Sequence, residues 1–439
     1  MSSETNRSVK FRAALKREIP AWIEQGVLTG EAANRLNSIY DLDSLGKESS
    51  RLLAAVLFTI GSLLVGGGVI SFVAAHWDQI SRGPKVAMLF ALLLAFYIAG
   101  YWLKYKSDWP RLGHALIFCG CLVFGANIGL IAQAYQVSGS WYRAFGAWAI
   151  GALLMAWAAQ SSITGALVIA TSFTWFIGFA NDYHERLVTL YPLLLVLALL
   201  PLAWRIRSRT LYSLTFLGFI GATTMLAFVQ LDADRYALIA IAVGGFVAWM
   251  VGEFHRASGI RSEFGAPLSN LGIAMLAAGA YFWSFHEFWR WSRDIGPNRL
   301  LWLIPLGSAL AIGAALIART WMKMDDLQKR YFGAAAAALV LVCLAPPISR
   351  YSDVLPVVML NLAAIVIAGL LIGKGIVEER RLTFWIGSLF LTTLVISRFF
   401  EYESSLLLKS AAFLICGILI ILAGIGYERF LRRKEAFAQ

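Results

Sequence analysis

The chain has 439 residues, of which 59% are hydrophobic and 15% are charged, and its formal net charge is +12 at pH 7. Soluble domains carry about 25% charged residues, so this composition excludes a soluble globular protein. The basic residues stand in short segments between apolar blocks, which is typical of membrane topology signals and argues against a nucleic-acid partner.

Residues 1–50 are polar and predict a small cytoplasmic head built as a helical hairpin. Gly26 is expected to end the first helix, and Thr29 to cap a second helix that runs through Tyr40. We expect the head to pack on the membrane domain or to lie on lipid headgroups. A docking or regulatory module is the alternative interpretation.

Continuous apolar blocks follow, and each has the length at which a helix crosses about 30 Å of hydrocarbon. They predict an all-α polytopic integral membrane helical bundle of about 14 transmembrane helices over residues 51–428. Residues 429–439 form a basic tail. The expected spans are 52–75, 86–103, 112–134, 143–159, 162–180, 187–204, 211–230, 236–252, 267–288, 300–318, 331–349, 354–373, 382–400 and 406–427. Spans 143–159 and 162–180 are joined only by Gln160 and Ser161, so they predict either a tight hairpin or one broken helix.

The orientation follows from the basic residues. With the N-terminus inside, most of the 38 Lys and Arg residues fall on the inner side, as the positive-inside rule requires. Both termini are therefore expected in the cytoplasm. The segment Gly373-Lys374-Gly375 is expected in a cytoplasmic loop, where it lacks the rest of a phosphate-binding motif.

The first candidate site is the outer end of span 112–134, where the helix pattern becomes polar at Asn127, Gln133, Tyr135 and Gln136, before Trp141. The two glutamines continue a stripe that contains Gly125 and Gly129, a GxxxG step that favours close helix packing. We therefore expect a packing face that ends in amide hydrogen bonds. A polar cavity that opens outward and binds a neutral solute or a headgroup is the alternative.

The second candidate is His76-Trp77-Asp78, which follows the first span and is expected on the same outer side. An interfacial tryptophan anchor, with Asp78 capping the next turn, is the favoured interpretation. A pH-sensing or proton-coupled pair is the sharper alternative, because histidine titrates near neutral pH.

The remaining motifs indicate no catalytic or metal-binding site. His286 and Glu287, with Arg290, Arg293 and Asp294, indicate an outer charge cluster. The HExxH pattern is absent because position 290 is Arg. We expect no metal, no cofactor and no catalytic residue. No expected helix midpoint carries a charged residue, which weakens the case for an ion-coupled transporter.

The N-terminal region carries the segments GVLTGEAANRL (26–36), AAHWDQI (74–80) and LGHALIFCGCLVFGANIGLIAQAYQVSGSW (112–141). It resembles an uncharacterised family of bacterial membrane proteins, domain-of-unknown-function family 2157, over about residues 1–160. The final helix and basic tail also look typical of such proteins. The resemblance implies a bacterial inner (cytoplasmic) membrane location and a many-helix architecture. It implies no activity, and His76 stands where Asn is more usual.

Three function classes remain. The first is transport of a small polar or lipidic molecule, and it predicts a water-accessible cavity that reaches the middle of the bilayer. The alternative is a non-enzymatic membrane scaffold or envelope-biogenesis partner, which predicts a solid bundle. An enzyme is the least favoured class. The expected partners are the lipid bilayer, a small polar or lipidic ligand, and a membrane protein partner or a second copy of the chain.

Overall fold

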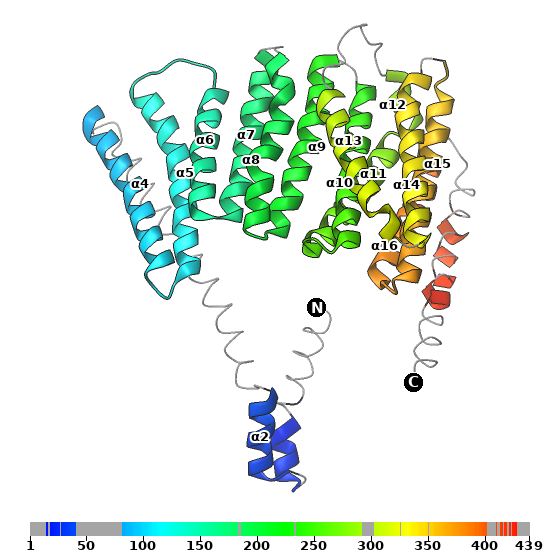
Figure 1. Ribbon diagram of the computed structural model, residues 1–439, viewed down its shortest axis with the longest axis horizontal. Helices are drawn as coiled ribbons and strands as arrows, with labels where there is room; N and C mark the ends of the chain where they lie inside the picture. Colours follow the sequence, from blue (N-terminus) through cyan, green and yellow to red (C-terminus); the bar gives the residue numbers. More distant parts are fainter. Residues whose placement is uncertain are drawn as a thin grey trace. The chain divides into compact units, whose positions relative to one another are not determined.

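The computed structural model is all-helical in the residues that it describes (Figure 1). These are residues 15, 18–26, 28–40, 81–182, 186–231, 234–291, 303–324, 326–349, 351–401 and scattered positions between 410 and 427. The chain divides into two compact units, Met1–Ala87 and Met88–Gln439.

The described part of the head is the predicted helical hairpin. Residues 18–24 are helical, and Gly26 follows with a φ of +72°, a left-handed conformation that glycine adopts without strain. Helix α2 (Gly30–Tyr40) then begins, and the Thr29 hydroxyl accepts a hydrogen bond from the backbone N–H of Ala32 at 3.4 Å. Both the predicted helix end at Gly26 and the predicted cap at Thr29 are confirmed.

Long helices make up the second unit, which begins within the first of them, and successive helices run in opposite directions (Figure 1). They are α4 (Arg82–Tyr105), α5 (Pro110–Ala134), α6 (Tyr142–Ala159), α7 (Ser162–Asp182), α8 (Tyr191–Arg205), α9 (Arg209–Leu231), α10 (Asp234–Ser258), α11 (Gly265–Phe282), α13 (Leu303–Thr320), α14 (Asp326–Ile348), α15 (Val354–Val377) and α16 (Arg381–Glu401). Short elements join some of them: η2 (Arg186–Leu190), η3 (Ser262–Phe264), α12 (His286–Trp291) and η5 (Trp321–Lys323).

Each of these long helices coincides with one of the expected spans from 86–103 to 382–400. Among the described residues, nine helices combine the length and the apolar composition of a membrane-spanning segment. The chain is therefore an all-α polytopic membrane bundle. The expected span 52–75 and much of 406–427 lie outside the described residues, so the total of fourteen stays a prediction.

The segment between residues 143 and 180 is a tight hairpin, not a broken helix. Gln160 ends α6 in the left-handed conformation with a φ of 47°, and the N–H of Ser161 donates to the carbonyl of Ala156 at 3.2 Å. This bond, which spans six residues, closes a Schellman motif. The Ser161 hydroxyl then caps α7 by accepting from the N–H of Thr164 at 3.4 Å.

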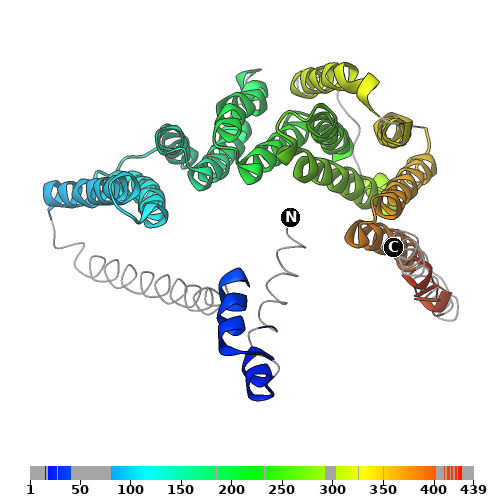
Figure 2. The same ribbon diagram turned by 60° about the horizontal axis from the view of Figure 1, so that its bottom comes forward.

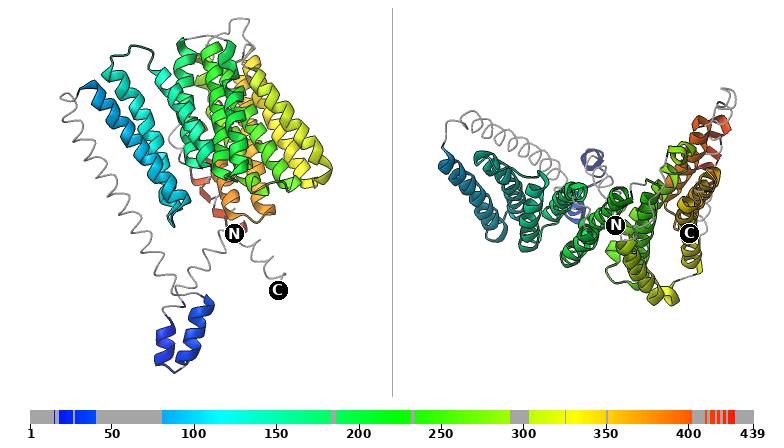
Figure 3. Two further views of the ribbon diagram at one scale, coloured as in Figure 1. Left: turned by 60° about the vertical axis from the view of Figure 1, so that its left-hand side comes forward. Right: turned by 90° about the horizontal axis from the view of Figure 1, so that it is seen from above.

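Helix α10 lies at the centre of the second unit, where it packs against α9, α11, α13 and α14. In its most apolar window 83% of the residues are buried, against 17% in α4 and 22% in α5. Figures 2 and 3 show α4 and α5 away from the group that contains α10. The exposed apolar faces of α4 and α5 are therefore the surfaces that hydrocarbon would cover.

Expected span 267–288 was too long. Helix α11 ends at Phe282, and α12 begins at His286. Ser284 lies in the break: its hydroxyl donates to the carbonyl of Tyr281 at 2.7 Å, and its own carbonyl accepts from the Arg398 guanidinium at 2.8 Å. Side chains therefore satisfy the backbone groups that the helix leaves free.

Two further helices extend beyond their expected ends at residues 252 and 373. Helix α10 continues to Ser258, and α15 continues to Val377, so Glu253 and Lys374 lie inside helices. Gly375 explains the second extension. A Cβ added there would lie 2.4 Å from the backbone nitrogen of Phe384, so this turn is packed tightly on α16. The prediction that Gly373-Lys374-Gly375 lies in a loop is wrong.

Candidate functional site

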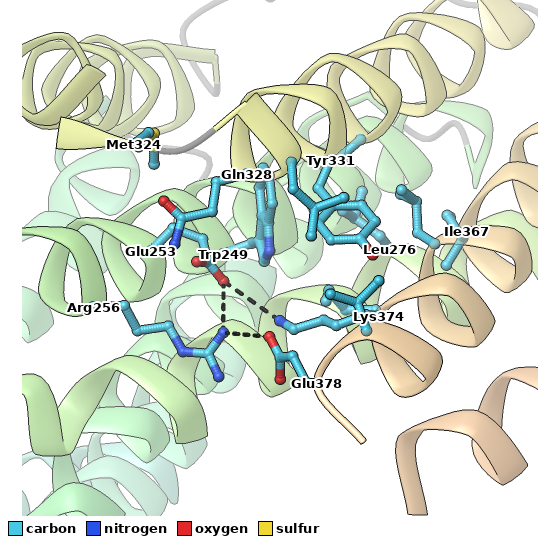
Figure 4. A pocket seen from close by; sticks show the side chains of 15 residues that line it. Trp249, Glu253, Arg256, Leu276, Met324, Gln328, Tyr331, Ile367, Lys374 and Glu378 are labelled. Atoms are coloured by element: carbon cyan, nitrogen blue, oxygen red, sulfur yellow. Dashed lines mark hydrogen bonds and ion pairs between the residues drawn. The ribbon is translucent and has the colours of Figure 1, made fainter. Parts of the chain in front are cut away.

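A cavity of about 170 Å³ lies among α10, α11, α14 and α15, near the C-terminal ends of α10 and α15 (Figure 4). Its wall combines four charged side chains with a larger apolar surface. The lining residues are Trp249, Glu253, Arg256, Ile273, Leu276, Met324, Leu327, Gln328, Tyr331, Ala335, Ile367, Leu370, Lys374, Val377 and Glu378. We call this space the Lys374 cavity.

Close contact of α10 and α11 forms one wall of the cavity. A Cβ on Gly252 would lie 2.5 Å from the backbone nitrogen of Ser269, and a Cβ on Gly272 would lie 2.5 Å from the backbone nitrogen of Trp249. Only glycine permits the two helices to come this close. The approach brings the Ser269 hydroxyl to 2.6 Å from Oε1 of Glu253, to which it donates a hydrogen bond.

Glu253 is the centre of the charged network. Besides Ser269, its Oε1 atom faces the Arg256 guanidinium at 3.4 Å and the Lys374 ammonium at 3.6 Å. Glu253 is 7% exposed. Because a buried carboxylate must be compensated by donors or opposite charges, these contacts explain how Glu253 is held within an apolar bundle.

The second carboxylate of the network, Glu378, caps the C-terminal end of α15. Its two oxygens face two different guanidinium groups, Arg256 at 3.7 Å and Arg380 at 3.2 Å. The five residues Glu253, Arg256, Lys374, Glu378 and Arg380 thus carry three positive and two negative charges. The network has an excess of one positive charge when all of them are ionised.

Lys374 differs from the other members of this network. Only 9% of its surface is exposed, yet its ammonium makes no hydrogen bond to any described residue, and its ion pair with Glu253 is long at 3.6 Å. An ammonium has three donors. Lys374 therefore presents unused donor capacity at the wall of the cavity, next to Glu253 (Figure 4).

The rest of the wall is apolar and aromatic, and it extends away from the charges. Trp249 lies one turn before Glu253 on α10, while Leu370 and Ile367 lie one and two turns before Lys374 on α15. Seven residues of helix between Ile367 and Lys374 correspond to about 10 Å. The cavity therefore has one charged end and one apolar end, and Ile367 lies near the middle of α15.

A second, more open groove of about 540 Å³ lies between α11, α15 and α16. It shares Ile273 with the Lys374 cavity, but its lining includes no charged side chain; the most polar residues there are Asn270, Thr383 and Thr393. A surface of this kind on a membrane-spanning helix is covered by hydrocarbon, so the Lys374 cavity is the better candidate site.

The structure places the residues of the first predicted site apart from this cavity. Asn127 is buried, and its amide nitrogen donates to the carbonyl of Leu89 on α4 at 3.0 Å. Gln133, Tyr135 and Trp141 are exposed. Gln136 is also exposed, in the left-handed conformation, and the N–H of Val137 donates to the carbonyl of Ala132 at 2.9 Å. Gln136 thus closes α5 by a Schellman motif.

The glycine stripe of α5 packs in its middle part. A Cβ on Gly125 would lie 2.2 Å from the Trp148 ring of α6, and the Trp148 indole N–H donates to the carbonyl of Cys121 at 2.8 Å. Nothing lies within 4 Å of the corresponding position at Gly129. The stripe is thus a packing face around Gly125. His76, Trp77 and Asp78 lie outside the described residues.

At the opposite end of the bundle, the predicted charge cluster around His286 is partly described. The backbone N–H of His286 donates to the Glu401 carboxylate, and Glu401 pairs with Arg398. The Arg398 guanidinium also donates to the Ser284 hydroxyl at 2.9 Å. These contacts tie α12 to α16. Arg293 and Asp294 lie outside the described residues.

The described residues hold no cluster of three or more His, Cys, Asp or Glu side chains that could bind a metal ion. The charged residues of the Lys374 cavity were missed from the sequence because Glu253 and Lys374 are more than a hundred residues apart. The available signal was a charged residue directly after glycine at the end of an apolar run, in Gly252-Glu253 and Gly373-Lys374.

Residues 20–164 match the protein family described as "Predicted membrane protein (DUF2157)". This match confirms the family resemblance of the N-terminal region, while the residues of the Lys374 cavity lie outside it. Comparisons with curated proteins and with solved structures found no match.

Proposed function

We propose that this protein binds a small polar or amphiphilic molecule in the Lys374 cavity and transports it across the bacterial inner membrane. The observation that carries the proposal is a buried ammonium that makes no hydrogen bond to any residue the structure describes, at the wall of a cavity inside an apolar bundle. A bundle that served only as a scaffold would gain by filling this space with apolar side chains, since well-packed apolar residues are often as stable as a buried charged network or more so.

The depth of the cavity also supports transport. It extends from Glu378, at the end of α15, to Ile367 near the middle of that helix. A binding site in the middle of the membrane is what alternating access requires. In the orientation that we propose, both chain termini and the charged end of the cavity face the cytoplasm.

The test uses cysteine accessibility in a background whose four native cysteines are replaced by alanine. Ala335 lines the cavity, whereas Ala337, two residues away on α14, is exposed on the outside of the bundle. In inside-out vesicles, a charged methanethiosulfonate reagent should modify the Ala335→Cys variant at least about tenfold faster than Ala337→Cys, because the reaction needs hydrated thiolate.

Equal, slow modification of the two variants would contradict a water-accessible cavity and would support the scaffold interpretation. Modification of Ala335→Cys only in right-side-out vesicles would reverse the proposed orientation. Reporter fusions at Asp182 and Ser352 test the orientation independently, because both positions should then lie outside.

The predicted outer site stays a proposal for the opposite side of the membrane. Its residues are His76, Trp77, Asp78, Asn127, Gln133, Tyr135, Gln136 and Trp141. Gln133 is exposed in the structure, so a Gln133→Cys variant should react with a water-soluble thiol reagent added from outside. Leu122→Cys, exposed in the middle of the same helix, is the matched control that hydrocarbon should protect.

A further inference from the structure

The Lys374 cavity has features that select a class of ligand. Resting on the proposed function, we propose that the bound molecule is an anionic amphiphile: its acidic group binds Lys374 and Arg256, and its apolar part lies against Leu276, Ile367 and Leu370. The acidic group is a phosphate or a carboxylate.

The charge distribution favours an anion over a cation. Both carboxylates of the network already face positive partners: Glu253 faces Arg256 and Lys374 and accepts from Ser269, and Glu378 lies between Arg256 and Arg380. A cationic ligand would have to compete with these groups. An anionic ligand instead meets the Lys374 ammonium, which makes no hydrogen bond to any described residue, while the four charged side chains that line the cavity balance one another.

Distances within the network also leave room for a new acceptor. Lys374 and Arg256 approach the carboxylates at 3.4 to 3.7 Å, whereas charge-assisted N–H···O bonds are about 2.7 to 2.9 Å long. An acidic oxygen placed between the ammonium and the guanidinium could form such short bonds with both. Figure 4 shows these two side chains directed toward the same carboxylate.

The apolar end requires more than a small inorganic anion. Leu276 lies two turns after Ser269 on α11, and Ile367 lies two turns before Lys374 on α15, so both line the part of the cavity away from the charges. Figure 4 shows Ile367 away from Arg256 and Glu378. Filling this part with water would leave apolar surface wetted, at about 25 cal/mol per Å². A short alkyl chain attached to the acidic group would displace that water and match the distance of about 10 Å along α15.

The experiment measures protection of the Ala335→Cys variant from N-ethylmaleimide, a neutral reagent, in a non-ionic detergent. The probes are hexyl phosphate, hexanoate, hexyltrimethylammonium, hexanol and inorganic phosphate. Hexyl phosphate or hexanoate should protect at concentrations at least about tenfold lower than hexanol or hexyltrimethylammonium, a difference that corresponds to about 1.4 kcal/mol.

Lys374→Met should weaken protection by the anionic amphiphile at least about tenfold, while Lys374→Arg, which keeps the charge, should retain it in part. Lys323→Met is the matched control, because this lysine is exposed in η5 at the same end of the bundle and does not line the cavity. It should leave protection unchanged. The probe series on the parent variant decides the question even where Lys374→Met does not fold.

Three results would overturn the inference: equal protection by hexyltrimethylammonium or hexanol, equal protection by inorganic phosphate, or undiminished protection in folded Lys374→Met. Equal protection by inorganic phosphate would assign the site to a free anion. Failure of the proposed function looks different. If the proposed function fails, Ala335→Cys reacts with the charged methanethiosulfonate reagent no faster than Ala337→Cys, even before any probe is added.

Discussion

The ion pair between Glu253 and Lys374 makes a quantitative prediction about the energetic coupling of the two helices that carry it. At 3.6 Å, two unit charges attract each other by about 4.6 kcal/mol if the effective dielectric constant is about 20. The side chains are only 9% and 11% exposed, so desolvation offsets part of this attraction. We expect a net coupling free energy of about 2 to 3 kcal/mol.

The assay is a double-mutant cycle with Glu253→Gln, Lys374→Met and the double variant, read as the free energy of unfolding in mixed detergent micelles. The control pair is Arg261 and Glu263 at the start of η3. Its charges are 3.7 Å apart, but the side chains are 23% and 26% exposed, so its coupling should stay below about 1 kcal/mol.

A coupling for Glu253 and Lys374 no larger than that of the control pair would refute the description of a buried charged network. The losses of unfolding free energy in the two single variants should add up to more than the loss in the double variant. Each single substitution leaves one buried charge without its partner, and the double variant leaves none. A strictly additive cycle would contradict this argument even if both single variants were destabilised.

Three more predictions concern the packing of the bundle, and each is measured as the free energy of unfolding. Gly252→Ala should destabilise the protein by about 1 to 3 kcal/mol, because the new Cβ would meet the backbone of Ser269 at 2.5 Å. Gly333→Ala is the control and should be neutral or stabilising, because nothing lies within 4 Å of its Cβ position. Equal effects of the two substitutions would contradict the close approach of α10 and α11. Gln136→Gly should stabilise by about 0.5 kcal/mol by relieving its left-handed conformation, and a loss of stability would argue against that conformation. Arg398→Met should cost about 3 to 5 kcal/mol, because it leaves the 5% exposed Glu401 side chain without its positive partner. Adding Glu401→Gln should recover part of this loss. If it recovers nothing, the loss comes from the hydrogen bonds between Arg398 and Ser284.

Apolar block length and local capping chemistry predicted most of the fold. Thr29 and Gly26 act as the sequence indicates, and the long helices of the described bundle coincide with expected spans. These are local properties, set within a few residues of the chain. Helix ends were less predictable at Ser284, because distant Arg398 satisfies the freed carbonyl there.

The candidate site was not predictable in the same way. Glu253 and Lys374 look like loop residues when an apolar window ends before them. Only the packing of α11 on both α10 and α15, together with the ion pair, shows that the two residues are buried together. Charge compensation between residues that are distant in sequence has no local signature. Asn127 illustrates the same limit, since its need for a partner was predictable but the Leu89 carbonyl was not.

The central claim is that Lys374 holds the acidic group of an anionic amphiphile. The most direct measurement is the dipolar coupling between phosphorus of bound hexyl phosphate and the ¹⁵N-labelled ammonium of lysine, recorded by solid-state NMR in a phosphate-free detergent. The account predicts a phosphorus–nitrogen contact of about 3 to 4 Å, which the Lys374→Met substitution abolishes and Lys323→Met preserves. A contact that survives in Lys374→Met, or no contact with bound probe, would contradict it.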